Sequence, residues 1–121
     1  MRGRGLKLPD LRRLLIAGAP VSGELLAKLR IVAPNCVTHT PYGATECLPV
    51  TTVTADELLG EARQLALRGQ GTCVGRPVSG VEIRVIRESD GPLLTLAEAQ
   101  PCAPGEIGEI IAYRPERDPR V

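Results

Sequence analysis

The stretch that decides the fold is LLIAGAPVSGELLAKLRIVAPNCVTHTPYG, residues 14–43. Its first four residues, 14–17, are all apolar and are soon followed by glycine and proline, which is typical of a short strand buried on both faces. Near its end, residues 36–40 contain β-branched side chains and precede a Pro-Tyr-Gly triplet, so they predict a second strand. The stretch therefore holds two candidate strands joined by a connecting segment.

The connecting segment predicts a helix. Ser22 stands where an N-cap is expected, Glu24 lies in the first turn, and basic residues come near the end. Three leucines share one face of it: Leu25, Leu26 and Leu29. We expect a helix of about nine residues, which gives the order strand, helix, strand. That order favours parallel pairing of the two strands through a right-handed crossover.

Parallel pairing also indicates where a ligand would bind. The loops that follow the two strands, residues 18–20 and 41–43, are expected to open at the same edge of the sheet. Ligands of open α/β sheets bind at the edge formed by the carboxyl ends of the strands. These two loops are therefore the first candidate site.

Beyond this stretch the chain predicts one more helix. Thr54 and Glu57 have the T-x-x-E spacing of a capping box, and Gly69 is expected to end the helix. Three apolar residues form its expected buried stripe: Leu58, Ala62 and Leu65.

The pattern then changes to a period of two, which predicts strands. Residues 81–86 alternate, with Val81, Ile83 and Val85 on the expected buried side of a half-buried strand. Residues 107–113 are the next candidate, and the connection through residues 90–92 favours antiparallel pairing. The predicted fold class is α/β, a βαβ piece of a parallel sheet followed by antiparallel strands.

The length of 121 residues suits one domain, which buries roughly two thirds of the surface of its unfolded chain. We expect this domain over residues 11–113, with an α/β part over 11–70 and a mostly β part over 71–113. A loosely ordered lead-in over residues 1–10 and a disordered tail over 114–121 would flank it.

Composition excludes several classes of function. A net charge of +1 gives no field for nucleic acid or a membrane surface, and the basic residues are not interleaved with aromatic ones. No apolar run approaches the roughly 20 residues of a membrane span, and no signal-peptide core follows the first residue. The four cysteines lack a C-x-x-C pair, which favours free thiols over a zinc site. We expect a soluble, cytoplasmic protein with no nucleic-acid partner.

The segment TPYGATE, residues 40–46, carries the most informative chemistry. Tyr42 offers a ring to a purine, and Gly43 lets a ligand approach the backbone closely because it has no Cβ. Thr45 offers a hydroxyl to a phosphate oxygen, and Glu46 offers a hard oxygen ligand to Mg²⁺. Considered alone, Tyr42 and Glu46 would more often be a turn residue and a surface acid. The combination of all these residues in one string favours a nucleotide site.

The string Y-G-x-T-E resembles a hallmark of the acyl-adenylate-forming superfamily, the AMP-dependent synthetases and ligases. LLIAGAPVS at residues 14–22 is similar to the strand and G-A-P turn of that superfamily, and two later strings match in order, GRP at 75–77 and GEIGEI at 105–110. The resemblance covers residues 11–112. Within the superfamily, TPYGATECLPV and GTCVGRPV look most like the olefin β-lactone synthetases, relatives of the fatty acyl-CoA ligases.

The resemblance implies the activation of a fatty or β-hydroxy fatty acid with ATP, giving acyl-AMP and then a thioester with CoA or a β-lactone. It implies that Tyr42 borders the adenine, that Thr45 bonds the α-phosphate, that Glu46 ligates Mg²⁺ and that Gly43 lies beside the acyl group. Thr45 and Glu46 would be the catalytic residues. The residues implied to bind the nucleotide are Gly18, Ala19, Pro20, Tyr42, Gly43, Ala44 and Thr45.

The chain also departs from the superfamily pattern. It contains no Ser/Thr/Gly-rich phosphate loop, no later ribose-binding aspartate and no C-terminal domain with its lysine, and past Ile111 the pattern does not continue. We therefore expect a piece of the large N-terminal domain, inactive as an isolated chain of 121 residues. The alternative is a non-catalytic truncated module that keeps the fold.

Overall fold

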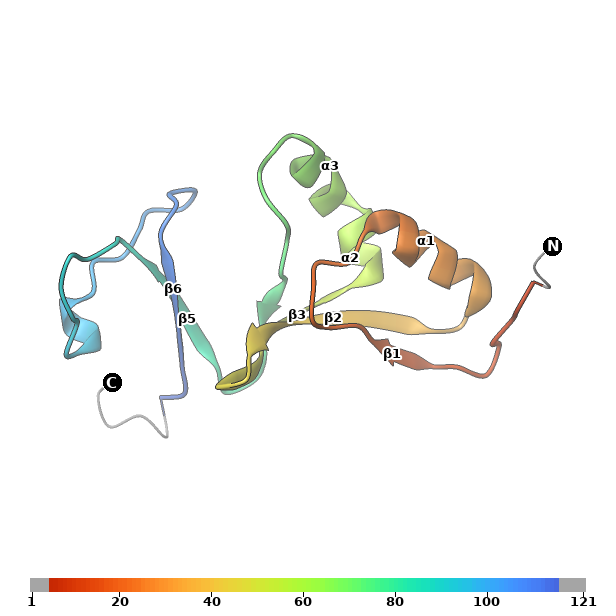
Figure 1. The fold of residues 1–121 in the computed structure, drawn as a ribbon, viewed down its shortest axis with the longest axis horizontal. Coiled ribbons are helices and arrows are strands. Elements are labelled where there is room, and N and C mark those ends of the chain that lie inside the picture. Colours follow the sequence, from red (N-terminus) through yellow and green to blue (C-terminus); the bar gives the residue numbers. More distant parts are fainter. Residues whose placement is uncertain (1–4, 116–121) are drawn as a thin grey trace. The chain divides into compact units, whose positions relative to one another are not determined.

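The computed structural model describes residues 5–115 (Figure 1), so parts of the predicted lead-in and tail lie outside the described residues. The chain divides into two compact units at the bond between Arg76 and Pro77, and the predicted single domain over 11–113 stays a prediction. In order, the elements are β1 (Arg13–Leu15), α1 (Gly23–Val32), β2 (Val37–Ala44), β3 (Cys47–Thr54), α2 (Ala55–Leu59), α3 (Glu61–Leu67), β4 (Arg76–Pro77), β5 (Glu82–Ile86), the 3-10 turn η1 (Leu96–Glu98) and β6 (Glu109–Tyr113).

The first unit contains the predicted βαβ arrangement. β1 pairs with β2 in parallel, with Leu15 opposite His39, and the sheet order is β1-β2-β3-β4. Helix α1 connects the two strands, and the hydroxyl of Ser22 accepts a hydrogen bond of 3.2 Å from the backbone N–H of Leu25. The predicted N-cap is therefore confirmed. Leu26 is the buried leucine of this helix, with 1% of its surface exposed.

Strand β1 differs from the prediction in length and burial. It has three residues, and Leu15 is 70% exposed, so it is not buried on both faces. The reason is its position, because β1 is an edge strand of the described sheet. The backbone N–H of Ile16 still donates to the carbonyl of His39 over 3.0 Å, so the parallel pairing continues one residue beyond β1.

The predicted loop over residues 41–43 is wrong, because β2 runs through it to Ala44. The chain turns at residues 45–46 and returns as β3, which pairs with β2 antiparallel. Pro41 and Gly43 are the residues from which the sequence predicts the end of the strand. Since β1 ends opposite His39, Pro41 lies where β2 has a strand on one side only, a setting in which a strand tolerates proline.

Strand β3 supplies much of the core of the first unit, and the sequence pattern did not reveal it. Its hydroxyl-bearing Thr51 is buried and donates a hydrogen bond to the carbonyl of Val74. This contact ties the segment before β4 to β3. Among the described residues of the unit, those that are buried are Leu26, Ala33, Thr38, Val50, Thr51, Val53 and Ala55.

The capping box at Thr54 is confirmed. The backbone N–H of Thr54 donates to Oε2 of Glu57 over 2.8 Å, and the N–H of Glu57 donates back to the Thr54 hydroxyl over 3.3 Å. The single helix predicted after it is instead two helices, α2 and α3. They separate at Gly60, whose ψ of −132° is not helical, in keeping with the low helix propensity of glycine.

The predicted stripe on these helices is only partly buried. Leu58 and Ala62 are half-buried, and Leu65 is exposed. The predicted end is confirmed: Gly69 has a φ of +81°, and its N–H donates to the carbonyl of Ala66.

The second unit is a two-stranded antiparallel ribbon of β5 and β6, as predicted, with Glu82 opposite Tyr113. The predicted buried face is wrong at its end, because Ile86 is buried and Val85 is 38% exposed. Ile86 lies on the face that also carries Glu82 and Tyr113, whose hydroxyl donates to the Glu82 carboxylate over 2.7 Å. Ile86 also forms an isolated antiparallel bridge with Pro101, a contact outside the ribbon that alternation along β5 cannot reveal.

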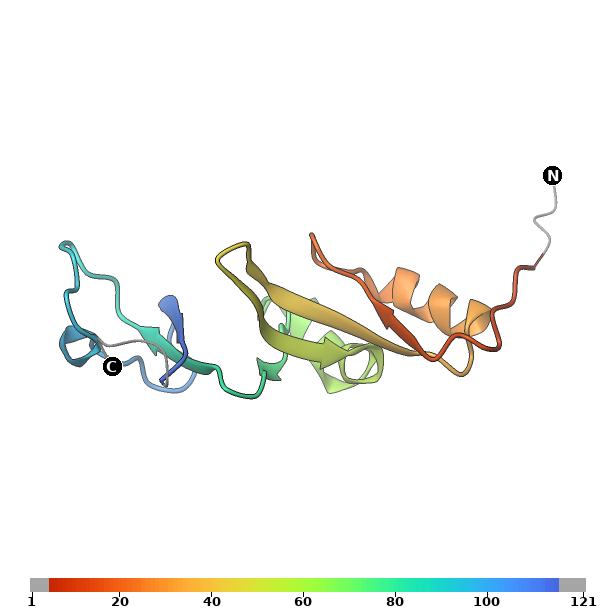
Figure 2. The same ribbon diagram turned by 90° about the horizontal axis from the view of Figure 1, so that it is seen from below.

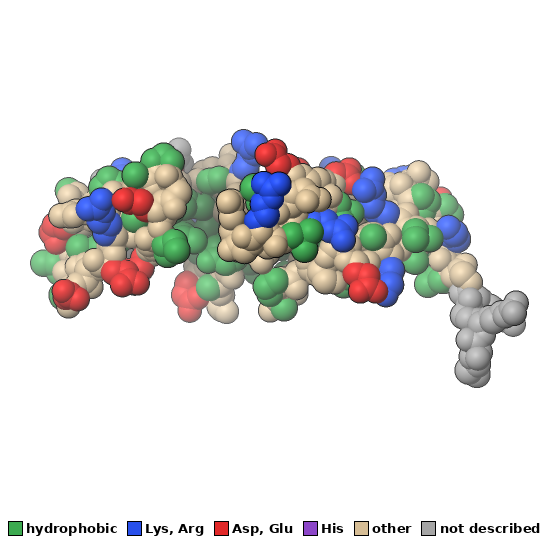
Figure 3. Space-filling model, turned by 90° about the horizontal axis from the view of Figure 1, so that it is seen from above, with side chains coloured by type: hydrophobic (Ala, Val, Ile, Leu, Met, Phe, Trp, Pro, Cys, Tyr) green, Lys and Arg blue, Asp and Glu red, His purple; other side chains and the backbone are tan. Residues whose placement is uncertain are grey.

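The distribution of charged side chains agrees with the formal net charge of +1. Basic and acidic side chains are interspersed on the face shown in Figure 3. All four cysteines are free thiols. Among residues 5–115, no helix is both long and apolar enough to cross a bilayer.

Candidate functional site

The candidate site is the tip of the β2–β3 hairpin. Ala44 pairs with Cys47, so Thr45 and Glu46 form the turn itself, and both are exposed. Tyr42 pairs with Thr51 one step below the tip and is 41% exposed. The structure therefore brings the predicted ring, hydroxyl and carboxylate together on one short projecting segment.

Gly43 has a structural reason to be glycine. The β2–β3 register shifts between Tyr42 and Ala44, and Gly43 lies in this bulge. A Cβ at Gly43 would collide with the carbonyl oxygen of Cys47 and would lie 3.1 Å from Cδ1 of Leu48. The hairpin thus requires glycine here in the absence of any ligand, and the predicted close approach of a ligand stays a prediction.

The second predicted segment, residues 18–20, follows β1. Gly18 has a φ of +99°, which favours glycine, and Ala19 and Pro20 are exposed like Gly18. Because β1 and β2 are parallel, this loop and the β2–β3 hairpin leave the sheet toward the same side, as Figure 2 shows. The loop after β1 and the hairpin tip therefore lie on the same side of the sheet, although residues 41–43 belong to a strand and not to the predicted loop.

The hairpin tip extends farther along the strand direction than the loop after β1 does. Strand β2 continues from His39, opposite the end of β1, to Ala44, which carries the hairpin tip roughly 17 Å farther along the strand direction. The tip and the loop after β1 thus form an open edge, and the pocket described next is lined by neither of them.

Glu46 is a single exposed carboxylate in the turn. Within residues 5–115, no group of three or more His, Cys, Asp or Glu side chains is placed to hold a metal ion. Mg²⁺ in nucleotide sites commonly takes one or two carboxylates and completes its shell with phosphate oxygens and water. Glu46 fits that mode of binding, in which the nucleotide supplies most of the ligands.

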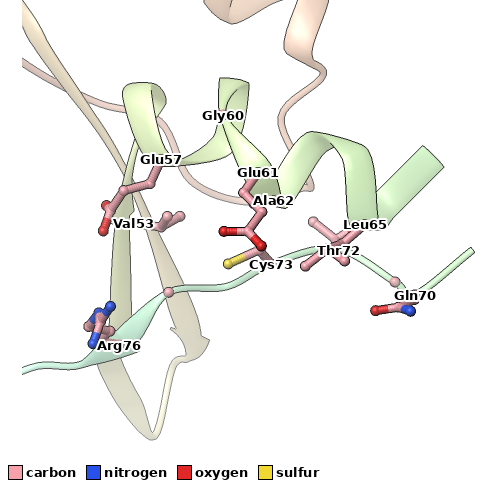
Figure 4. A pocket seen from close by; sticks show the side chains of 12 residues that line it. Val53, Glu57, Gly60, Glu61, Ala62, Leu65, Gln70, Thr72, Cys73 and Arg76 are labelled. Atoms are coloured by element: carbon pink, nitrogen blue, oxygen red, sulfur yellow. The ribbon is translucent and has the colours of Figure 1, made fainter. Parts of the chain in front are cut away.

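The structure also contains a pocket that the sequence did not predict. It has a volume of about 580 Å³ and lies between α2 and α3 on one side and residues 70–76 on the other (Figure 4). Val53, Glu57, Glu61, Cys73 and Arg76 are among its lining residues. No motif joins these positions, so only the fold reveals that they line one space.

Within the described part of the chain, two side chains have shifted pKa values, and both lie away from the hairpin tip. The pKa of Glu57 is lowered, first by the hydrogen bond from the Thr54 backbone, then by that from the Thr54 hydroxyl, with smaller contributions from Arg76 and His39. The pKa of Tyr113 is raised, chiefly because its hydroxyl donates to Glu82. Both shifts reflect hydrogen bonds that maintain local structure.

The profile of the AMP-binding enzyme family, described as "AMP-binding enzyme", matches residues 2–116, and the chain belongs to this family. The predicted family and fold class are confirmed.

One relative is the olefin beta-lactone synthetase of Stenotrophomonas maltophilia (strain K279a), 43% identical over 112 residues. The alignment covers 92% of this chain and 20% of that protein, so the chain spans about a fifth of its relative's length.

Two solved structures support the fold. The crystal structure of VinN matches with a TM-score of 0.66 and 25% identity, over 90% of this chain and 23% of VinN. A long-chain-fatty-acid-CoA ligase (FadD1) from Archaeoglobus fulgidus matches with a TM-score of 0.58 and 25% identity, over 91% of this chain and 20% of the ligase.

Proposed function

We propose that this chain is part of an enzyme that activates a carboxylic acid with ATP, and that the β2–β3 hairpin tip binds the nucleotide. Membership of the AMP-binding family supports a role with ATP and AMP. The observation that carries the proposal is the clustering of Tyr42, Thr45 and Glu46 on one exposed tip, on the same side of the sheet as the loop after β1.

In the proposed reaction, a carboxylate oxygen of the substrate attacks the α-phosphorus of ATP, and the bond to the bridging oxygen breaks. The products are acyl-AMP and pyrophosphate, and no proton need move because the nucleophile is already an anion. Thr45 would donate a hydrogen bond to an α-phosphate oxygen, and Tyr42 would lie along the adenine. Glu46 would hold Mg²⁺, which neutralises charge as the phosphates separate.

The proposed substrate is a fatty or β-hydroxy fatty acid. The names of two similar proteins support this proposal, since one is a beta-lactone synthetase and the other a long-chain-fatty-acid-CoA ligase. The second step would then transfer the acyl group to the thiol of CoA or close a β-lactone through the substrate's own hydroxyl group.

The proposal is tested by the affinity of the chain for ATP with Mg²⁺, measured by isothermal titration calorimetry. Glu46→Gln and Thr45→Val should each weaken binding by about 10-fold or more, because each removes a charge-assisted contact to the nucleotide. Asp90→Asn is the matched control, since it neutralises an exposed carboxylate in the second unit. Equal affinity of the wild type and Glu46→Gln would contradict the proposed site.

A non-catalytic module that keeps the fold is the second candidate, and the openness of the hairpin tip favours it. All seven predicted nucleotide-binding residues are exposed, so nothing in the described structure excludes water from them. Assays of pyrophosphate release with fatty and β-hydroxy fatty acids separate the candidates. Binding of ATP without pyrophosphate release, together with a cooperative thermal transition, would favour the non-catalytic module.

A further inference from the structure

The pocket between α2, α3 and residues 70–76 lies away from the proposed nucleotide site. Strand β3 begins next to the hairpin tip and ends at Thr54, where α2 begins, so the pocket and the tip are separated by about 20 Å along the strand. Its lining comes entirely from the first unit. It is therefore a separate feature whose chemistry can be considered independently.

Both walls of this pocket are fixed by specific contacts. On the helical wall, the capping box holds Glu57 against Thr54. On the opposite wall, Thr51 bonds the carbonyl of Val74, and Gly75 lies so close to the backbone of Thr52 that a Cβ would collide with it. The pocket is thus formed by the folded chain itself, as small-molecule sites usually are.

The charged groups of the pocket do not balance. Its lining includes two carboxylates, Glu57 and Glu61, and one guanidinium, Arg76, which leaves a formal net charge of −1. Glu57 accepts two hydrogen bonds of 2.8 Å from Thr54 and lies toward the same end as Arg76 (Figure 4). Glu61 forms no hydrogen bond or salt bridge through its side chain with any residue between 5 and 115, and its carboxylate turns into the pocket.

The lining of the pocket also includes apolar side chains. Val53 is buried, and Ala62 and Leu65 belong to the same helix as Glu61. The volume of about 580 Å³ is within the usual range of roughly 300–1,000 Å³ for ligand pockets. A negative group beside apolar side chains is complementary to a ligand with one positive head and a short apolar body.

We propose that this pocket binds a small organic monocation, a primary ammonium or guanidinium on a short apolar chain. Its head would lie at Glu61 and its chain against Leu65 and Val53. A carboxylate or phosphate in the same place would be disfavoured by the net negative charge. The proposal goes beyond the proposed function and does not depend on it, because no residue of the hairpin tip lines the pocket.

The alkylation rate of the Cys73 thiol reports whether the pocket is occupied. Cys73 is exposed and turns into the pocket from the wall opposite Glu61, whereas Cys36, Cys47 and Cys102 are half-buried and do not line it. The alkylation rate of each cysteine by iodoacetamide is measured by peptide mass spectrometry on the full chain. Three probes with the same carbon chain are compared at constant ionic strength: hexylammonium, hexanoate and hexanol.

Hexylammonium should slow the alkylation of Cys73 by about tenfold when its concentration is about ten times its dissociation constant, because only the unoccupied protein reacts. The other three cysteines should react at unchanged rates. Hexanoate should give no protection, and hexanol should bind more weakly than hexylammonium. Equal protection by all three probes, or stronger protection by hexanoate, would overturn the proposal.

A pair of variants tests the role of Glu61. Glu61→Gln should weaken binding of hexylammonium by about tenfold, since it removes the charge but keeps the shape of the side chain. Glu24→Gln on α1 is the control, because Glu24 is exposed and does not line the pocket. Unchanged binding by Glu61→Gln would overturn the proposal. If that variant does not fold, as judged by circular dichroism, the comparison of the three probes on the wild type decides the question alone.

Discussion

The base and the tip of the β2–β3 hairpin differ in what their residues contact. At the base, Val50, Thr51 and Val53 are buried in the core of the first unit. At the tip, Thr45 and Glu46 are exposed. We infer that the base maintains the fold and that the exposed tip is available to a ligand. Substitutions should therefore divide into those that lower stability and those that lower only affinity.

The largest effect on stability is expected where the base meets the tip. Gly43→Ala should lower the free energy of unfolding by about 3 kcal/mol, because its Cβ collides with the backbone carbonyl of Cys47 and no rotamer relieves the clash. Gly91→Ala is the control, since a Cβ there meets nothing within 4 Å, and it should change stability by less than about 0.5 kcal/mol. Urea unfolding measures both. Equal stability of the two variants would contradict the hairpin geometry.

A smaller loss is expected within the base itself. Val53 is 2% exposed and Val37, on the paired strand, is 50% exposed. Val53→Ala should cost about 2 kcal/mol, because buried methyl groups are lost and a cavity remains. Val37→Ala should cost less than about 0.5 kcal/mol. Similar losses from the two variants in urea unfolding would show that the base is not the core.

The smallest effect concerns the capping box at the end of β3. The pKa of Glu57 is lowered from its ordinary value of 4.5, chiefly by the hydrogen bond from the Thr54 backbone. The folded state thus favours the ionised carboxylate, so the stabilisation is fully present above pH 4.5 and is lost as the pH falls through the lowered pKa.

This pH dependence can be measured by urea unfolding from neutral pH to below 4.5. Glu57→Gln should lose less stability over that range than the wild type does. Glu61→Gln is the control, because it neutralises a carboxylate that caps no helix. Identical pH profiles for the wild type and Glu57→Gln would contradict the contribution of the capping box.

The features predicted correctly from the sequence are those determined by neighbouring residues. Ser22 and the pair Thr54 and Glu57 cap their helices through contacts three residues apart, so their spacing alone predicts them. The parallel pairing of β1 and β2 follows from the order of elements. The antiparallel ribbon in the second unit follows from two strands and a turn.

The features that were missed depend on contacts between distant residues. Proline and glycine are depleted in strands, and at positions 41 and 43 they lie within β2, which pairs with β3. Ile86 rather than Val85 is buried, and Ile86 bridges to Pro101, 15 residues later in the chain. The pocket unites Glu61 with residues 70–76, which no motif links. The tip residues themselves were identified from their motif, and their roles stay predictions.

Backbone amide NMR during titration with ATP and Mg²⁺ can show whether the exposed hairpin tip binds the nucleotide. We expect the largest shifts at the amides of residues 42–46, smaller shifts at Gly18 and Ala19, and unchanged signals from β5 and β6. Shifts confined to residues 70–76, or no shifts at saturating nucleotide, would contradict binding at the tip.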